Sequence, residues 1–393
     1  MAKLEYNVYE DPTLKAMDEA LELKQKLEKP RNYLGASEIG NECERYLFYS
    51  FRNAKARVIS AKGIKAIEDG FDQEAKTIER LRMLPFIELH TTDGTFDKDG
   101  NPNQIGFDDM LLGHVRGHVD GMIKGLLQAT STWHIFEHKS VNEKKFNELK
   151  KLIEEKGEKE ALYHWDTIYY GQAQLYMHRF ELTRHYLVCS TPGGRDHISV
   201  RTEYKRAYAE MLIEKAKNII FDNWNIPARI SDRREYYKCQ WCNYQSICHD
   251  GEVPDINCKT CRYRDCIDEG KSKCLLDDTI IEETLLNVGC QSHIYNPALM
   301  PECKLVEHQE DGCIYHIPEK NFYFANTNLT GFPDVKGQLD AIFTSKELKE
   351  KIKNINNLGV ATAKVQKAFS GEISPKVKPW DSLSNDHSKL RDI

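Results

Sequence analysis

Gly117-His-Val-Asp-Gly121 and Phe136-Glu-His-Lys-Ser140 are the two stretches of sequence that decide the fold of this chain. Each is expected to lie in a β-strand, and the small and polar residues between them predict the turn of a hairpin. Successive side chains of a strand alternate between its two faces, so Asp120 points away from the apolar face. Glu137 and Lys139 are two residues apart and share a face. The hairpin would therefore present the three charged side chains together.

Asp120, Glu137 and Lys139 are a minimal set for metal-dependent cleavage of a phosphodiester. Two carboxylates supply the hard oxygen ligands that Mg²⁺ or Mn²⁺ prefers. A lysine beside them can position the attacking water and offset the charge that develops in the transition state. Taken alone, such a trio is more commonly a solvated strand pair with an ion pair, so the flanking segments carry the argument.

Helices are expected on both sides of the hairpin. Downstream, Gln172 and Tyr176 are four residues apart in a segment without proline, and they share one helix face. Upstream, an amphipathic pattern from about Ile64 to Leu84 predicts a long helix. Glu74 on that helix can supply a further metal ligand, with Glu79 as its nearest competitor and an ordinary surface carboxylate as the alternative for both.

Further elements complete an α/β pattern in the same half of the chain. A charged helical stretch is expected from residue 143 to 162, and strands are expected at 184–190 and 198–203. A helix over 205–223 then leads into a group of cysteines. This mixture of helices and strands predicts a central mixed sheet flanked by helices.

The order helix, Asp strand, Glu-x-Lys strand and Gln-x-x-x-Tyr helix resembles the PD-(D/E)xK nuclease superfamily and, within it, the RecB-like exonucleases. The resemblance covers roughly residues 31–250. The roles that it implies are metal ligands at Asp120 and Glu137, a catalytic lysine at Lys139, support of the site and DNA contact by Gln172 and Tyr176, and a further metal ligand in the carbonyl of His138. Many RecB-like members carry a histidine on the upstream helix, whereas Glu74 here is similar to the pattern of lambda-type exonucleases.

The first group among the 12 cysteines is the triplet Cys239, Cys242 and Cys248, for which Cys43 is the natural fourth ligand. One distant cysteine followed by such a triplet resembles the iron–sulfur subset of RecB-like nucleases, which includes AddB and CRISPR-associated relatives. The resemblance implies a 4Fe–4S cluster, although zinc accepts the same four thiolates. Either centre would close a loop of roughly 200 residues and so restrict the unfolded chain.

A second group of cysteines begins with a Cys-x-x-Cys pair, which is typical of a metal knuckle. The expected ligands of a separate structural Zn²⁺ are Cys258, Cys261, Cys274 and Cys290, with Cys266 or His293 as substitutes. This group predicts a small cysteine-rich accessory domain. The resemblance of that domain to C-terminal extensions of phage-encoded exonucleases rests on less specific motifs.

The chain is expected to divide into three parts. Residues 1–250 form the nuclease-like domain with its iron–sulfur centre, and residues 256–345 form the zinc-binding accessory domain. The segment Gly251-Glu-Val-Pro-Asp255 is the expected linker between them. From 346 to 393 few apolar residues are present, and a partly ordered tail is expected.

The composition is that of an ordinary soluble protein, with 40% hydrophobic and 30% charged residues among 393. A run of about 18 apolar residues is absent, so no membrane span is expected. The N-terminus lacks the apolar core of a signal peptide, which favours a cytoplasmic location and disfavours disulfides. The net charge of −6 is compatible with DNA binding, because the local field around a groove matters more than the sum.

The motifs and the resemblance together predict a Mg²⁺- or Mn²⁺-dependent DNA exonuclease that acts on DNA ends or single strands, and the resemblance implies that a phage or mobile element encodes it. A recombination protein or a second copy of the chain is a possible partner. The main alternative is an inactive or inhibitory nuclease-fold module that binds DNA or protein. A redox-sensing thiolate–metal protein is a third hypothesis, but it leaves Asp120, Glu137, Lys139 and Gln172 unexplained.

Overall fold

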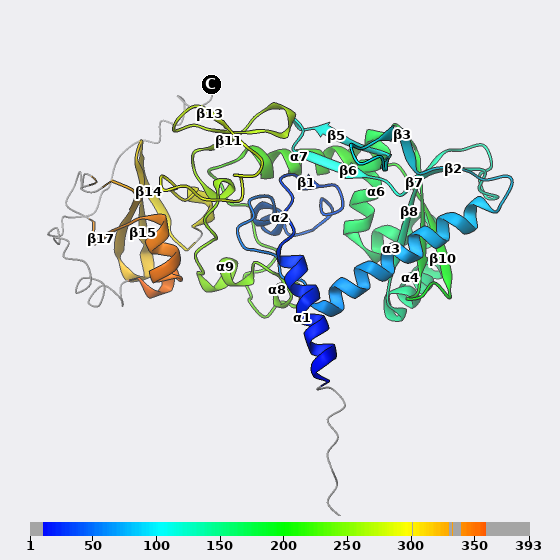
Figure 1. Cartoon of the computed structure of the whole chain (residues 1–393), viewed down its shortest axis with the longest axis horizontal. Helices are drawn as coiled ribbons and strands as arrows, with labels where there is room; N and C mark the ends of the chain where they lie inside the picture. The colour runs from blue at the N-terminus through cyan, green and yellow to red at the C-terminus, as the bar shows by residue number, and fades with distance from the viewer. Residues whose placement is uncertain (1–10, 301, 330–331, 333–338, 359–393) are drawn as a thin grey trace, which may run out of the picture.

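The computed structural model describes residues 11–300, 302–329, 332 and 339–358 of the chain. It is a mixed α/β protein with a five-stranded sheet near one end and a four-stranded sheet at the other (Figure 1). The five-stranded sheet has the order β10-β9-β8-β7-β2, and only its β8–β9 pair is parallel. Its strands are β2 (Glu88–His90), β7 (Gly121–Lys124), β8 (His134–Ser140), β9 (Arg184–Ser190) and β10 (His197–Glu203). The mixed sheet is thus present as predicted.

Helices cover both faces of this sheet. The face that carries Phe136 and Val188 packs against α3, through Ile78 and Leu81. The opposite face, which carries Ile135, packs against α4 to α7. These helices are α3 (Ala61–Arg82), α4 (Glu143–Lys156), α5 (Glu158–Trp165), α6 (Thr167–Arg179) and α7 (Arg206–Phe221). Since the side chains of β8 alternate, Glu137 and Lys139 share the face covered by α6.

The helix boundaries follow local capping. Ser60 caps α3 and Asn142 caps α4, each through a side-chain oxygen that accepts a backbone N–H of the first turn. Asp166 caps α6 in the same way. The stretch 143–162, expected to be continuous, is divided because Gly157 adopts φ 82°, which ends α4 and starts α5 in a new direction.

The chain bends beside Asp120, where one continuous strand is expected from the sequence. Strand β6 (Val115–His118) joins a separate three-stranded sheet with β1 (Leu34–Gly35) and β5 (Gly106–Met110), whereas β7 pairs with β8. The predicted hairpin between β7 and β8 is therefore confirmed. Asp120 lies outside both strands, at the junction of the two sheets.

The remaining elements lie around the five-stranded sheet and the sheet of β1, β5 and β6, and toward the far end of the molecule (Figure 1). They are α1 (Pro12–Lys26), α2 (Glu44–Phe51), β3 (Thr92–Phe96), β4 (Pro102–Gln104), α8 (Tyr237–Gln240), α9 (Gln245–Asp250), β11 (Arg264–Cys266), β12 (Ser272–Cys274), β13 (Thr279–Ile281), β14 (Lys304–Gln309), β15 (Gly312–Ile317), β16 (Phe322–Thr327), β17 (Ala341–Phe343) and α10 (Ser345–Glu347). None of the described helices is both long and apolar enough to cross a bilayer.

The segment 251–255 is buried, which differs from the exposed linker expected from its Gly and Pro. Val253 is fully buried in a second core with Tyr295 and Leu348. Its backbone N–H donates to the carbonyl of Lys353, and that of Asp255 donates to the carbonyl of Ala54. These two bonds connect the residues that follow α2 with the second core. Within the tail expected at 346–393, Leu348, Ile352, Ile355 and Leu358 pack in this core, while residues 359–393 lie outside the described residues.

Candidate active site

The three charged residues of the hairpin motif meet at one end of β8. The Nζ of Lys139 lies 2.7 Å from Oε2 of Glu137 and 3.9 Å from Oδ2 of Asp120. The same Asp120 oxygen accepts a hydrogen bond of 2.7 Å from the backbone N–H of His138. The bend that releases Asp120 from β6 and β7 therefore lets its carboxylate close against β8.

Gln172 and Tyr176 connect this group to α6. The amide of Gln172 donates to Oε2 of Glu137 at 3.3 Å and to the hydroxyl of Tyr176 at 3.1 Å. The Tyr176 hydroxyl donates in turn to the carbonyl of His118 at 2.7 Å. A Cβ at Gly117 would lie 2.7 Å from the Tyr176 ring, so this glycine permits the close approach. The relay fixes the position of the Glu137 carboxylate from the side of α6.

Burial and mutual repulsion shape the electrostatics of the site. Desolvation, followed by the field of Asp120, raises the pKa of Glu137 to about 8. Burial opposes the charge of Lys139, but the fields of Glu137 and Asp120 outweigh it and raise the pKa of the ammonium above its ordinary value. Lys139 is therefore a cation throughout the physiological range.

Glu74, rather than Glu79, belongs to the electrostatic environment of this group. Burial and the field of Asp120 raise the pKa of Glu74 to about 7, whereas Glu79 is exposed. One turn earlier on α3, Asp69 accepts hydrogen bonds from Ser140 Oγ at 3.2 Å and from the backbone N–H of Gly193 at 3.3 Å. These bonds hold α3 over the end of β8. The sequence argument missed Asp69, although it lies in the same amphipathic pattern.

The ring of His138 lies on the face of β8 opposite Glu137. It is buried, neither ring nitrogen has a hydrogen-bond partner, and burial lowers its pKa to about 4. The ring is therefore neutral. The metal-ligand role predicted for His138 concerns its carbonyl oxygen and stays a prediction.

Tyr169 is a neighbour of the site that the sequence argument did not include. The Nζ of Lys139 lies 5.7 Å from the centroid of its ring. Tyr169 precedes Gln172 by three residues on α6, so the two side chains share a helix face. Its helical spacing from Gln172 was a signal available in the sequence.

The donor chemistry of the site fits a hard divalent cation. Oε1 of Glu137 is buried without a hydrogen-bond partner, and Glu74 and Asp120 add carboxylates whose mutual repulsion a cation would relieve. Within the described residues, no three His, Cys, Asp or Glu side chains are gathered closely enough to hold a metal ion as they stand. Binding would therefore draw the carboxylates together and displace their protons.

This proton displacement predicts that the affinity for Mn²⁺ rises with pH. With pKa values of about 7 and about 8, Glu74 and Glu137 are protonated at pH 6 and must lose their protons before they can act as ligands. We expect the affinity, measured by calorimetry from pH 6 to pH 9, to increase steadily and to level off above the pKa of Glu137. Carboxylates with ordinary pKa values near 4 would give a flat profile over this range, which would contradict the assignment.

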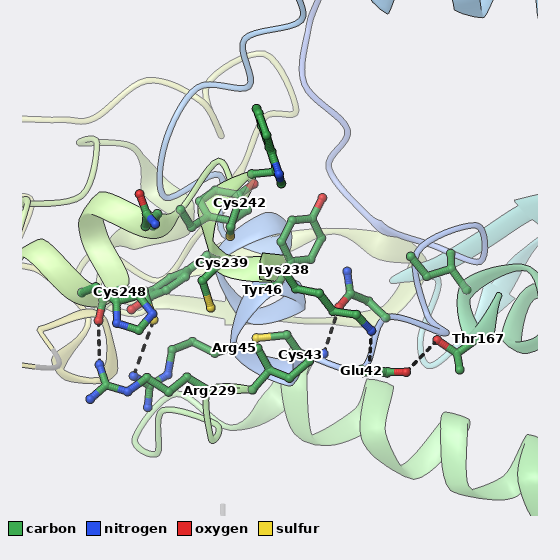
Figure 2. A pocket seen from close by; sticks show the side chains of 18 residues that line it. Glu42, Cys43, Arg45, Tyr46, Thr167, Arg229, Lys238, Cys239, Cys242 and Cys248 are labelled. Atoms are coloured by element: carbon green, nitrogen blue, oxygen red, sulfur yellow. Dashed lines mark hydrogen bonds and ion pairs between the residues drawn. The ribbon is translucent and has the colours of Figure 1, made fainter. Parts of the chain in front are cut away.

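The four cysteines of the first group line one cavity of about 350 Å³ (Figure 2). Cys43 precedes α2, while Cys239, Cys242 and Cys248 come from the segment of α8 and α9. Burial raises the pKa of Cys242 to about 11, and the other three thiols add to this rise. Arg45 is a neighbour of opposite charge, with Nη1 donating to Sγ of Cys248 at 3.9 Å. The four thiols thus share one cavity, but as they stand they are not close enough together to hold a metal ion, so the metal centre expected from the sequence stays a prediction.

The second group of cysteines also converges. Burial, followed by the fields of Cys290 and Cys274, raises the pKa of Cys258 to about 11. Burial raises the pKa of Cys261 to about 12, with Cys290 and Cys258 among the contributors. The substitutes considered from the sequence have other neighbours: Cys266 Sγ lies 3.9 Å from the carbonyl of Ile220, and His293 Nε2 lies 3.1 Å from Thr260 Oγ1. Cys258 likewise has a neighbour outside the group, since its Sγ donates to the carbonyl of Val288 at 3.3 Å, and the ligand set of this group stays a prediction.

Comparison with known proteins gives only remote similarity. No protein-family model and no curated protein sequence matches this chain. The alkaline exonuclease LHK-Exo from Laribacter hongkongensis, solved alone and in complex with dAMP, is 12–13% identical at a TM-score of 0.32, over 51% of this chain and 90% of that one. The structure of SSO0001 is 14% identical at the same TM-score, over 60% of this chain and 96% of that one. At these values the conclusions rest on the side-chain geometry.

Proposed function

We propose that this protein is a Mg²⁺- or Mn²⁺-dependent deoxyribonuclease that degrades DNA from its ends. The observation that carries the proposal is the convergence of Lys139, Glu137 and Asp120, with Gln172 and Tyr176 holding Glu137 from α6. An ordinary surface ion pair would not require a buried lysine, a carboxylate oxygen without a partner or a relay of hydrogen bonds from a second element.

Each residue has a distinct task in this proposal. Glu74, Asp120 and Glu137 would hold the divalent cation, which supplies Lewis-acid polarisation of the phosphate when bound. Lys139, fixed 2.7 Å from Glu137, directs its ammonium toward the attacking water and offsets negative charge on the phosphate. Gln172 and Tyr176 keep the Glu137 carboxylate in one orientation, so that little reorganisation accompanies the reaction.

The two groups of cysteines have a structural role in the proposal. A 4Fe–4S cluster at Cys43, Cys239, Cys242 and Cys248 would join the start of α2 to the segment that follows α7. A Zn²⁺ at Cys258, Cys261, Cys274 and Cys290 would hold the small sheet of β11, β12 and β13. What supports the first centre is that its four thiols line one cavity, and what supports the second is that Cys258 lies in the fields of Cys290 and Cys274.

The proposal is tested by incubating the protein with end-labelled linear DNA and with closed circular DNA in Mg²⁺ or Mn²⁺. We expect the linear substrate to be degraded and the circular one to survive, because an exonuclease requires a free end. Loss of the circle would instead indicate an endonuclease built on the same residues. Binding of either DNA without cleavage would reject the enzyme and favour the inactive binding module.

A further inference from the structure

The ring of Tyr169 has two lysine ammonium groups as neighbours. The Nζ of Lys139 is 5.7 Å from the ring centroid, and that of Lys145 is 5.8 Å from it. Lys139 belongs to the candidate active site and is mostly buried. Lys145 lies in the first turn of α4, and 45% of its side chain is exposed. Lys145 is therefore a second cation, accessible to solvent, beside the same ring as the lysine assigned to catalysis.

Lys145 is held in place by its surroundings. Its Nζ lies 2.9 Å from Oδ2 of Asp166 and 5.7 Å from the centroid of the Trp165 ring. The Trp165 indole N–H donates to the backbone carbonyl of Lys145 at 3.0 Å, which joins α4 to the end of α5. The long side chain of Lys145 thus loses much of its freedom in the folded protein, and less entropy remains to be lost when it binds a ligand.

Asp166 leaves Lys145 available to an anion. Its Oδ1 caps α6 by accepting from the backbone N–H of Ile168 at 3.0 Å, and Oδ2 contacts Lys145. A partly exposed pair of this kind contributes only about 0–1 kcal/mol. A phosphate of DNA can therefore take the place of the carboxylate at Lys145 at little cost, while Asp166 keeps its cap on α6.

We propose that Lys145 binds the phosphate next to the scissile one in a single strand of DNA, and that Tyr169 is the positioning residue that sets the spacing of Lys145 from Lys139. This subsite rests on the proposed function. Because Lys139 and Lys145 lie beside the same ring, a strand whose scissile phosphate lies at Lys139 brings its neighbouring phosphate near Lys145, and each phosphate that a lysine neutralises adds to the salt dependence of binding. Cation–π attraction holds both ammonium groups at the ring.

The test measures binding of a fluorescent single-stranded oligonucleotide without divalent metal, over a series of salt concentrations. We expect Lys145→Met to weaken binding about 3- to 10-fold at low salt and to reduce the salt-dependence slope by about 0.7, the value for one phosphate contact on a single strand. Lys145→Arg keeps the charge and is expected to retain the slope. The same series tests Tyr169. Tyr169→Phe keeps the aromatic ring and should preserve binding, whereas Tyr169→Leu removes the ring and should weaken it.

Lys205 provides the matched control. It is 49% exposed and pairs with Glu160 at 3.1 Å, but its backbone N–H bonds to Gln174, on the side of α6 away from Gln172. Lys205→Met should leave the slope unchanged. An unchanged slope in Lys145→Met, with DNA binding and cleavage by the wild type intact, overturns the subsite alone. A wild type that neither binds nor cleaves DNA overturns the proposed function together with it.

Discussion

Replacing Lys139 by alanine is expected to slow DNA cleavage by about a thousandfold while DNA binding and the fold persist. The ammonium is fixed between Glu137 and Asp120, where it can act on the water and the phosphate in the transition state. Single-turnover cleavage of labelled linear DNA measures the loss, and anisotropy of the same DNA measures binding. The fall should appear in the rate of the chemical step rather than in affinity.

The fold should survive this substitution because Glu137 can respond to it. Lys139 lowers the pKa of Glu137, so its removal raises that pKa further and the buried carboxyl group stays neutral to a higher pH. Lys124→Ala is a suitable control, since Lys124 lies on the adjacent strand β7, half-buried against Trp133. It should cleave at the rate of the wild type. Activity of Lys139→Ala within tenfold of the wild type would remove this lysine from the mechanism.

Replacing Cys43 by serine is expected to abolish iron binding and to lower the free energy of unfolding by on the order of 4 kcal/mol, as the loss of a crosslink across a long loop does. The thiol of Cys43 faces the cavity lined by Cys239, Cys242 and Cys248. A cluster bound there, as proposed, would link α2 to that segment, and the loss of Cys43 would break this link. Elemental analysis and denaturant unfolding measure the two effects.

Cys189→Ala is the matched control, because Cys189 is a buried cysteine that is not expected to bind the cluster. It is fully buried in β9, where it packs in the main core as a small apolar residue. Cys189→Ala should keep the full iron content and cost far less stability than Cys43→Ser. If the wild-type protein is colourless and carries two zinc ions per chain, the first centre is zinc rather than an iron–sulfur cluster, and the proposed crosslink is retained. Full stability of Cys43→Ser would reject the crosslink itself.

Periodic patterns in the sequence were enough to predict the main elements of the sheet. The strand expected at 184–190 has those bounds as β9, and the helix expected over 205–223 is α7. Gln172 and Tyr176 share a face of α6 because four residues make about one helical turn. Such patterns can be read from the sequence because the backbone geometry of a strand or helix sets which face each side chain occupies.

Breaks in those elements were harder to predict. The bend at Asp120 separates β6 from β7, and Gly157 separates α4 from α5, although hydrophobic periodicity continues across both positions. The segment 251–255 was expected to be exposed, but Val253 is buried by residues far away in the sequence. The break at Gly157 is a local effect of its positive φ, whereas the burial of Val253 arises where tertiary packing overrides a local preference.

The sequence by itself determined which residues can perform the chemistry, since Asp, Glu-x-Lys, Gln-x-x-x-Tyr and the cysteine spacings are properties of the chain. Only the tertiary structure decided which of them meet. It brought Glu74 rather than Glu79 into the field of Asp120, placed Cys43 in one cavity with the distant triplet and set Tyr169 beside two lysines. The reason is physical: burial, fields and close contacts depend on distances between elements, which the packing of helices on the sheet alone establishes.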